Sequence, residues 1–155
     1  MKAHLEKIGE KKFILTAVVG CFLGDLWLAY YLYQKFSNRT MFNSMLELLM
    51  QQPQNQGVLL DKNSVDGLYA LIVNTLVLFL ALMILLHLVN YLFFSKKKNF
   101  AFRYLTLLTW IGAPGCILLG IGNLNLPLVG LTFILQGIIY AYVAVGLWHY
   151  PWDKN

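Results

Sequence analysis

The chain has 155 residues, of which 59% are hydrophobic and only 12% are charged. An ordinary soluble domain carries about 25% charged residues, and here the apolar residues also form long unbroken runs. Because such runs are typical of membrane-spanning helices, the composition excludes an ordinary water-soluble fold. The net charge is +5, but the basic residues lie beside the apolar runs and form no basic face with interleaved aromatics. No nucleic-acid partner is therefore expected.

Four apolar runs predict spanning helices at about 12–34, 67–94, 101–123 and 127–149. The first run follows a basic segment, as in a signal peptide. It is longer than a signal-peptide core and lacks a clean small-x-small cleavage site, so we interpret it as a helix. The second run is the longest and is expected to tilt or protrude. We predict a single all-α integral membrane domain over residues 1–155.

The connections predict the topology. The turns at 95–99 and 124–126 are short, which favours antiparallel neighbours and an up-down-up-down four-helix transmembrane bundle. Basic residues are concentrated on one side, which places both termini in the cytoplasm by the positive-inside rule. The predicted inner segments hold nine of them and the outer segments three: Lys2, Lys7, Lys11, Lys12, Lys96, Lys97, Lys98, Arg103 and Lys154, against Lys35, Arg39 and Lys62.

Aromatic residues mark the two expected interfaces with the lipid bilayer. They are Trp27, Tyr30, Tyr31 and Tyr33 at the outer end of the first span, and Trp148, Tyr150 and Trp152 at the inner end of the fourth. We expect a multi-pass protein, with a bacterial inner (plasma) membrane as the favoured location, although the sequence does not determine which membrane it is.

The outer loop at 35–66 contains a helical pattern. Apolar residues recur at i, i+3, i+4 and i+7, which predicts a short amphipathic helix over about 41–51: Phe42, Met45, Leu46 and Leu49. The segment 52–57 then breaks it. A hydrophobic lid resting on lipid headgroups is favoured over a partner-docking surface.

Asp25 is the most informative residue, because it lies near the middle of the first span. An ionised carboxylate there costs about 2.5 kcal/mol or more, so Asp25 is expected to face the protein interior or a wet cavity. Three roles stay open: a protonated structural residue, which is favoured, a proton- or cation-binding site, or an ion pair with a partner subunit. By depth, Gln136 is the expected partner. Arg103 and His87 are expected nearer the inner surface, so no ion pair within the chain is predicted.

Other polar residues also lie within the spans. Thr132, Gln136 and Tyr140 form a stripe at i, i+4, i+8 on the fourth helix, interpreted as structural hydrogen bonding. For His87, a packing role is favoured over a titrating or ligand-binding role. The candidate binding or buried polar residues are Asp25, Gln136, Asn74, His87 and Asn90.

Small residues predict where helices approach closely, since lipid supplies no hydrophobic drive between them. Three uses of these seams stay open: packing within the bundle, contact in an oligomer, or both. Pro114 predicts a kink at mid-membrane. The seam residues are Thr106, Thr109, Ala113, Cys116, Gly120 and Asn123 on the third helix, Gly20 and Gly24 on the first, and Gly130, Gly137, Ala141 and Ala144 on the fourth.

No catalytic, metal or cofactor motif is present in the sequence. The leading hypothesis is a non-enzymatic subunit that assembles with itself or with a partner membrane protein through the small-residue seams and buried polar contacts. The alternative is a small ion channel or proton-coupled carrier with Asp25 as the titrating site. An intramembrane enzyme using Asp25, His87 and Cys21 comes third.

Overall fold

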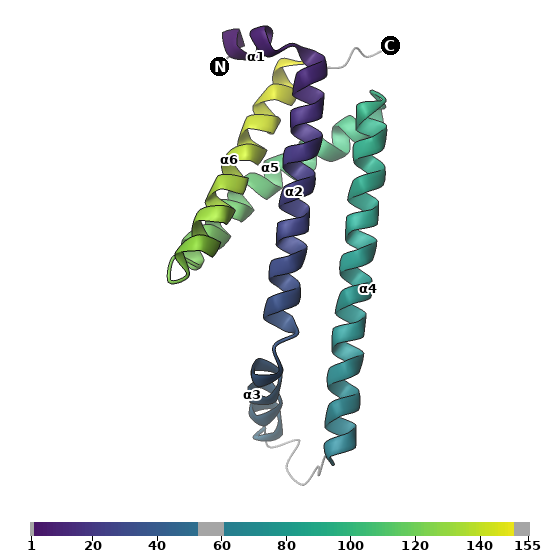
Figure 1. The fold of residues 1–155 in the computed structure, drawn as a ribbon, viewed down its shortest axis with the longest axis vertical. Coiled ribbons are helices and arrows are strands. Elements are labelled where there is room, and N and C mark those ends of the chain that lie inside the picture. Colours follow the sequence, from purple (N-terminus) through teal and green to yellow (C-terminus); the bar gives the residue numbers. More distant parts are fainter. Residues whose placement is uncertain (1, 53–60, 151–155) are drawn as a thin grey trace. The chain divides into compact units, whose positions relative to one another are not determined.

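The computed structural model describes residues 2–52 and 61–150, and within these ranges the chain is helical and contains no strand. The predictions made for the breaking segment after Gln52, for Trp152 and for Lys154 lie outside the described residues. Figure 1 shows the six helices, α1 (Lys2–Ile8), α2 (Glu10–Phe36), α3 (Arg39–Met50), α4 (Lys62–Ser95), α5 (Asn99–Gly122) and α6 (Pro127–His149).

Four of these helices, α2, α4, α5 and α6, are long and apolar enough to cross a membrane. This confirms four helices of spanning length where the sequence predicts four spans, and α6 has the predicted bounds. Helix α4 begins at Lys62, five residues before the predicted start at 67. The first turn, α1, was not predicted, because seven residues are too few to show a helical period. Gly9 separates it from α2 in the left-handed region, with φ 77°.

The chain forms two compact units, and each is described by itself. The first unit contains Met1–Asp25 and Leu86–Asn155, and the second contains Leu26–Leu85. The boundaries fall inside α2 and α4. The predicted topology and the side of the membrane on which each end lies stay predictions.

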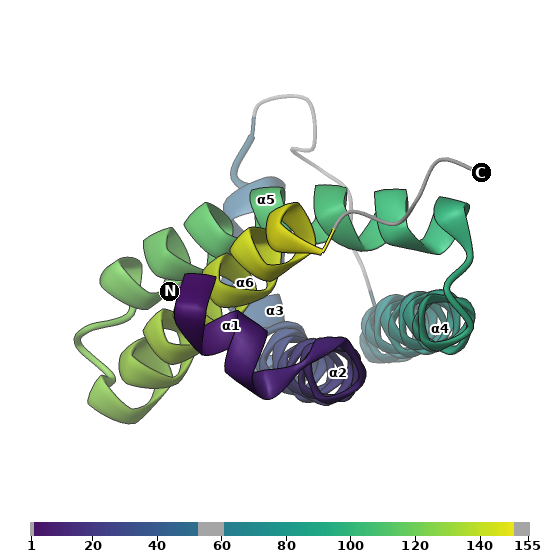
Figure 2. The same ribbon diagram turned by 90° about the horizontal axis from the view of Figure 1, so that it is seen from above.

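In the first unit, α5 and α6 lie side by side along a seam of small residues (Figures 1 and 2). A Cβ atom on Gly130 would lie 2.9 Å from the carbonyl oxygen of Gly120, and one on Gly137 would lie 3.0 Å from that of Ala113. Thr109 and Cys116 are buried in the same row. These residues therefore serve packing within the chain. Helix α5 continues through Pro114, and the predicted kink there stays a prediction.

Helix α1 and the start of α2 pack against α6 in the same unit. The Phe13 ring lies 5.5 Å from the Tyr150 ring, centroid to centroid, and occupies the space above Gly146, where a Cβ would meet it at 2.1 Å. The Tyr150 hydroxyl donates a hydrogen bond to the Leu5 carbonyl. The start of α2 and the end of α6 thus lie at the same end of this unit.

In the second unit, α3 packs against the start of α4. The Arg39 guanidinium pairs with the Asp66 carboxylate and lies 4.5 Å from the Tyr69 ring centroid. The Tyr69 hydroxyl donates to the Ser37 carbonyl at 2.6 Å. An apolar cavity of about 200 Å³ lies beneath, and its lining includes Phe42, Met45, Leu46 and Leu49 of α3 with Leu68 and Ile72 of α4. A helix is therefore present where the sequence predicts one, and its relation to a membrane stays a prediction.

The α5–α6 seam predicts the effect of adding a single methyl group. Gly130→Ala would place a Cβ within 3.0 Å of two backbone oxygens, those of Gly120 and Asn123, so the helices must separate. We expect a loss of about 1–3 kcal/mol of stability, measured by thermal unfolding in detergent. Gly115→Ala is the matched control, because no atom lies within 4 Å of its Cβ position. Equal unfolding temperatures for the two variants would contradict the close packing.

Candidate functional site

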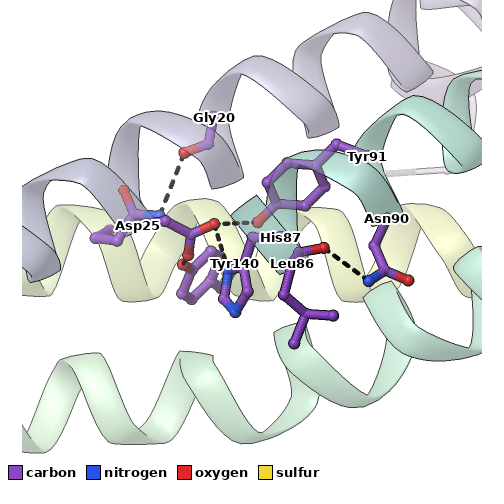
Figure 3. Close-up of polar contacts among 8 residues, drawn as sticks. Gly20, Asp25, Leu86, His87, Asn90, Tyr91 and Tyr140 are labelled. Carbon is purple, nitrogen blue, oxygen red and sulfur yellow. Dashed lines mark hydrogen bonds and ion pairs between the residues drawn. The ribbon is translucent and has the colours of Figure 1, made fainter. Parts of the chain in front are cut away.

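The Asp25 carboxylate is surrounded by three hydrogen-bonding side chains (Figure 3). Its Oδ2 lies 2.7 Å from His87 Nδ1 and also accepts a hydrogen bond from the Tyr91 hydroxyl. Its Oδ1 accepts a hydrogen bond from the Tyr140 hydroxyl at 2.9 Å. All four residues belong to the first unit. We call Asp25, His87, Tyr91 and Tyr140 the Asp25 cluster.

Three helices place these side chains. Asp25 comes from α2, and Tyr140 comes from α6. His87 and Tyr91 are four residues apart on α4, and this spacing puts them on one helical face. A glycine of α5 makes room for Tyr140, because a Cβ on Gly112 would lie 2.7 Å from the Tyr140 ring. The cluster therefore depends on the packing of α5 as well as on the helices that supply its members.

Burial makes the hydrogen bonds important. Asp25 is only 1% exposed, and Tyr91 and Tyr140 are also buried. An ionised carboxylate only accepts hydrogen bonds, and each bond to a charged group contributes about 1.5–3 kcal/mol. Two tyrosine hydroxyls donate to it, and His87 is the third donor in the tautomer that carries a proton on Nδ1. The carboxylate is thus satisfied by residues of its own chain.

Asp25 and His87 form a pair that can hold or release a proton. A neutral imidazole beside an ionised carboxylate gives the pair one negative charge, and one further proton makes the pair neutral overall. The His87 side chain is 12% exposed, its ring contacts Tyr104 edge-on with the centroids 5.8 Å apart, and its Nε2 forms no hydrogen bond within the described part of the chain. That nitrogen is the open position of the cluster.

The prediction that Gln136 is the hydrogen-bond partner of Asp25 was wrong. The Gln136 Nε2 donates to the Gly20 carbonyl at 3.3 Å, and Tyr140, one turn further along the predicted polar stripe, reaches the carboxylate instead. A Cβ on Gly24 would lie 1.8 Å from the Gln136 Nε2, so the amide fills the space that this glycine leaves open. Gln136 therefore bonds the α2 backbone next to Asp25.

The expectation that no basic side chain of this chain reaches Asp25 was also wrong, since His87 contacts it. Depth was counted along each span as if the helices were upright and level. Such a count converts to depth at 1.5 Å per residue only for a helix parallel to the membrane normal. Tyr91 was missed altogether, although its spacing of four from His87 is a signal that both residues share a face.

None of the remaining candidates forms a hydrogen bond with the Asp25 cluster within the described part of the chain. Asn90 donates to the Leu86 carbonyl of its own helix at 2.8 Å, and Thr132 likewise donates to Leu128 at 2.6 Å. Asn74 lies in the second unit, is exposed, and forms no hydrogen bond with any residue that the structure describes. Ala141 is exposed on α6.

The described residues contain no metal-binding cluster and no thiol hydrogen-bonded to a base. Among the described residues, no group of three or more His, Cys, Asp or Glu side chains could hold a metal ion. Cys21 is fully buried one turn before Asp25, and within the described ranges no hydrogen bond joins it to His87. A nucleophile and a base in contact are therefore not found among the three residues considered for an intramembrane enzyme.

Comparison with protein-family models, with curated proteins and with solved structures finds no match to this chain. What is established is a chain with four apolar helices compatible with an integral membrane protein. Function is therefore inferred from the geometry of the Asp25 cluster.

The cluster predicts unequal effects for two tyrosine variants. Tyr140→Phe removes one donor from a buried carboxylate and should cost about 1–3 kcal/mol of stability. Tyr104→Phe is the control, because its hydroxyl forms no hydrogen bond with the described residues while its ring still contacts His87. Thermal unfolding of both variants in the same detergent measures the difference. If Tyr140→Phe unfolds at the temperature of Tyr104→Phe, the Tyr140 hydrogen bond is not stabilising.

Proposed function

We propose that this protein is a small proton-coupled membrane carrier in which the Asp25–His87 pair binds and releases the coupling proton. The observation that carries the proposal is the 2.7 Å contact between these two titratable side chains inside spanning helices. Ionisable residues within a membrane are costly and mark ion or proton pathways by default. In this proposal both ends of the chain face the cytoplasm of a bacterial cell.

The surroundings of the pair support this function over a purely structural one. Tyr91 and Tyr140 provide hydrogen bonds from α4 and α6 to the carboxylate, and these bonds are stronger to its charged form than to its neutral form. Loss of the proton therefore changes the attraction among α2, α4 and α6. A helix arrangement that responds to protonation is what a carrier needs to couple proton binding to conformational change.

The proposal predicts a protonation change at Asp25. Infrared difference spectra of the reconstituted protein, recorded across a pH change, should show the carbonyl stretch of a protonated carboxyl group. The band should be absent in Asp25→Asn, shifted in His87→Gln, and unchanged in the control His149→Gln, whose residue lies at the end of α6 outside the cluster. A spectrum of Asp25→Asn identical to that of the unaltered protein would rule out Asp25 as the proton-binding group.

Proton movement is tested separately. Liposomes loaded with a pH-sensitive dye and given a potassium diffusion potential should acidify faster with the protein than without it. We expect Asp25→Asn and His87→Gln to lower this rate about a hundredfold or more, the scale of a lost proton-transfer group, and His149→Gln to leave it unchanged. A rate unaffected by the first two variants would exclude this pathway.

A second candidate function, membrane assembly, is supported by Asn74. Its amide is exposed on a spanning helix and forms no hydrogen bond with the described residues, and in a membrane such groups bond across helices. The small residues of α5 and α6 are occupied by each other, so α4 is the favoured contact surface for a second copy or a partner membrane protein.

Assembly through Asn74 predicts that Asn74→Leu weakens self-association by about fivefold, since such a bond contributes about 1 kcal/mol. Native mass spectrometry in mild detergent measures the ratio of oligomer to monomer. Asn43→Leu makes the same chemical change on α3, outside the spans, and should leave this ratio unchanged. A monomer in both variants and in the unaltered protein would count against assembly of this chain with itself.

A further inference from the structure

An apolar groove of about 590 Å³ runs between α2 and α6 in the first unit. Its α2 wall includes Leu15, Thr16 and Val19, and its α6 wall includes Ile138, Ile139 and Tyr142. The volume lies in the range of small-molecule sites, about 300–1,000 Å³. Both walls belong to helices long and apolar enough to span a bilayer, and Leu15 and Ile138 on them are exposed. In a bilayer the groove would therefore open toward hydrocarbon, where an empty groove would forfeit dispersion contacts.

Two lysines stand at one end of this groove. Lys11 precedes Leu15 by four residues, and Lys12 precedes Thr16 by four, so both lie one turn beyond the groove on the same side of α2. Both are exposed, and neither forms an ion pair or hydrogen bond through its side chain with the described residues. Glu10, the acidic residue beside them, pairs instead with Lys97 at 2.7 Å.

Aromatic residues place this end at the membrane surface. Tyr150 contacts Phe13 near the start of α2, and Trp148, at the same end of α6, is highly exposed. Exposed tryptophan and tyrosine at the ends of spans lie at the level of lipid headgroups. In a bilayer, these two lysines would therefore lie at the level of the phosphate groups of the adjacent leaflet.

We infer that this groove binds an anionic phospholipid, with an acyl chain between α2 and α6 and its phosphate at Lys11 and Lys12. Charge complementarity selects this occupant, because two exposed lysines with no side-chain partner among the described residues favour a headgroup with net negative charge over a zwitterionic one. The preference amounts to about fivefold per lysine. The site is separate from the Asp25 cluster and stands whether or not the chain moves protons.

Native mass spectrometry of the full chain tests the inference. The protein in mild detergent is mixed with equal amounts of dioleoylphosphatidylglycerol and dioleoylphosphatidylcholine, which have the same acyl chains and different headgroup charge. We expect preferential retention of the phosphatidylglycerol. In the double variant Lys11→Gln/Lys12→Gln its binding should weaken about 5- to 25-fold, while the control Lys62→Gln, an exposed lysine at the start of α4, should retain it.

The groove itself is tested by filling it. Val19→Trp should reduce retention of both lipids, whereas Leu118→Trp, which adds the same ring at an exposed position of α5, should not. Val19 is 47% exposed and Leu118 is 68% exposed, so neither change disturbs the buried core, and circular dichroism checks that helicity is equal.

Three outcomes would overturn the inference. The first is equal retention of the two lipids, and the second is a double variant that binds as Lys62→Gln does. The third is a protein dimer that carries no lipid and is lost in Val19→Trp, since the groove would then be an interface between two copies. The lysine variants decide the headgroup assignment even if Val19→Trp lowers the helicity.

Discussion

The first unit of this protein depends on how the Asp25 carboxylate is satisfied. A carboxyl group inside a spanning helix can neither be solvated by lipid nor left without hydrogen bonds at low cost. Here His87, Tyr91 and Tyr140 supply contacts from α4 and α6. The position of this single acid therefore requires three helices, far apart in the sequence, to meet at one point.

Small residues make that meeting possible. Gly112 leaves the space in which the Tyr140 ring lies, and Gly24 leaves the space for the Gln136 amide that bonds the α2 backbone. Gly130 and Gly137 let α6 approach the α5 backbone. In a membrane, close contact replaces the hydrophobic effect between helices. The polar contacts around Asp25 therefore depend on the same small residues that let the helices pack closely.

The groove between α2 and α6 and the Asn74 amide differ in chemistry from the Asp25 cluster. The groove between α2 and α6 is apolar and ends near two exposed lysines, which suits a lipid with a charged headgroup. Asn74 offers an amide on a spanning helix, which suits another protein helix. The three proposed functions, proton binding, lipid binding and assembly, therefore involve different residues.

The sequence by itself determined the spans, the helix over α3 and the importance of Asp25. Hydropathy and helical period are local properties, and the cost of a charge in hydrocarbon depends only on the residue and its place in a span. The partners of Asp25 were decided by tertiary structure. Whether Gln136, Tyr140 or His87 reaches the carboxylate depends on helix tilt and rotation, which are set by packing against neighbouring helices and are not encoded in the pattern of any one segment.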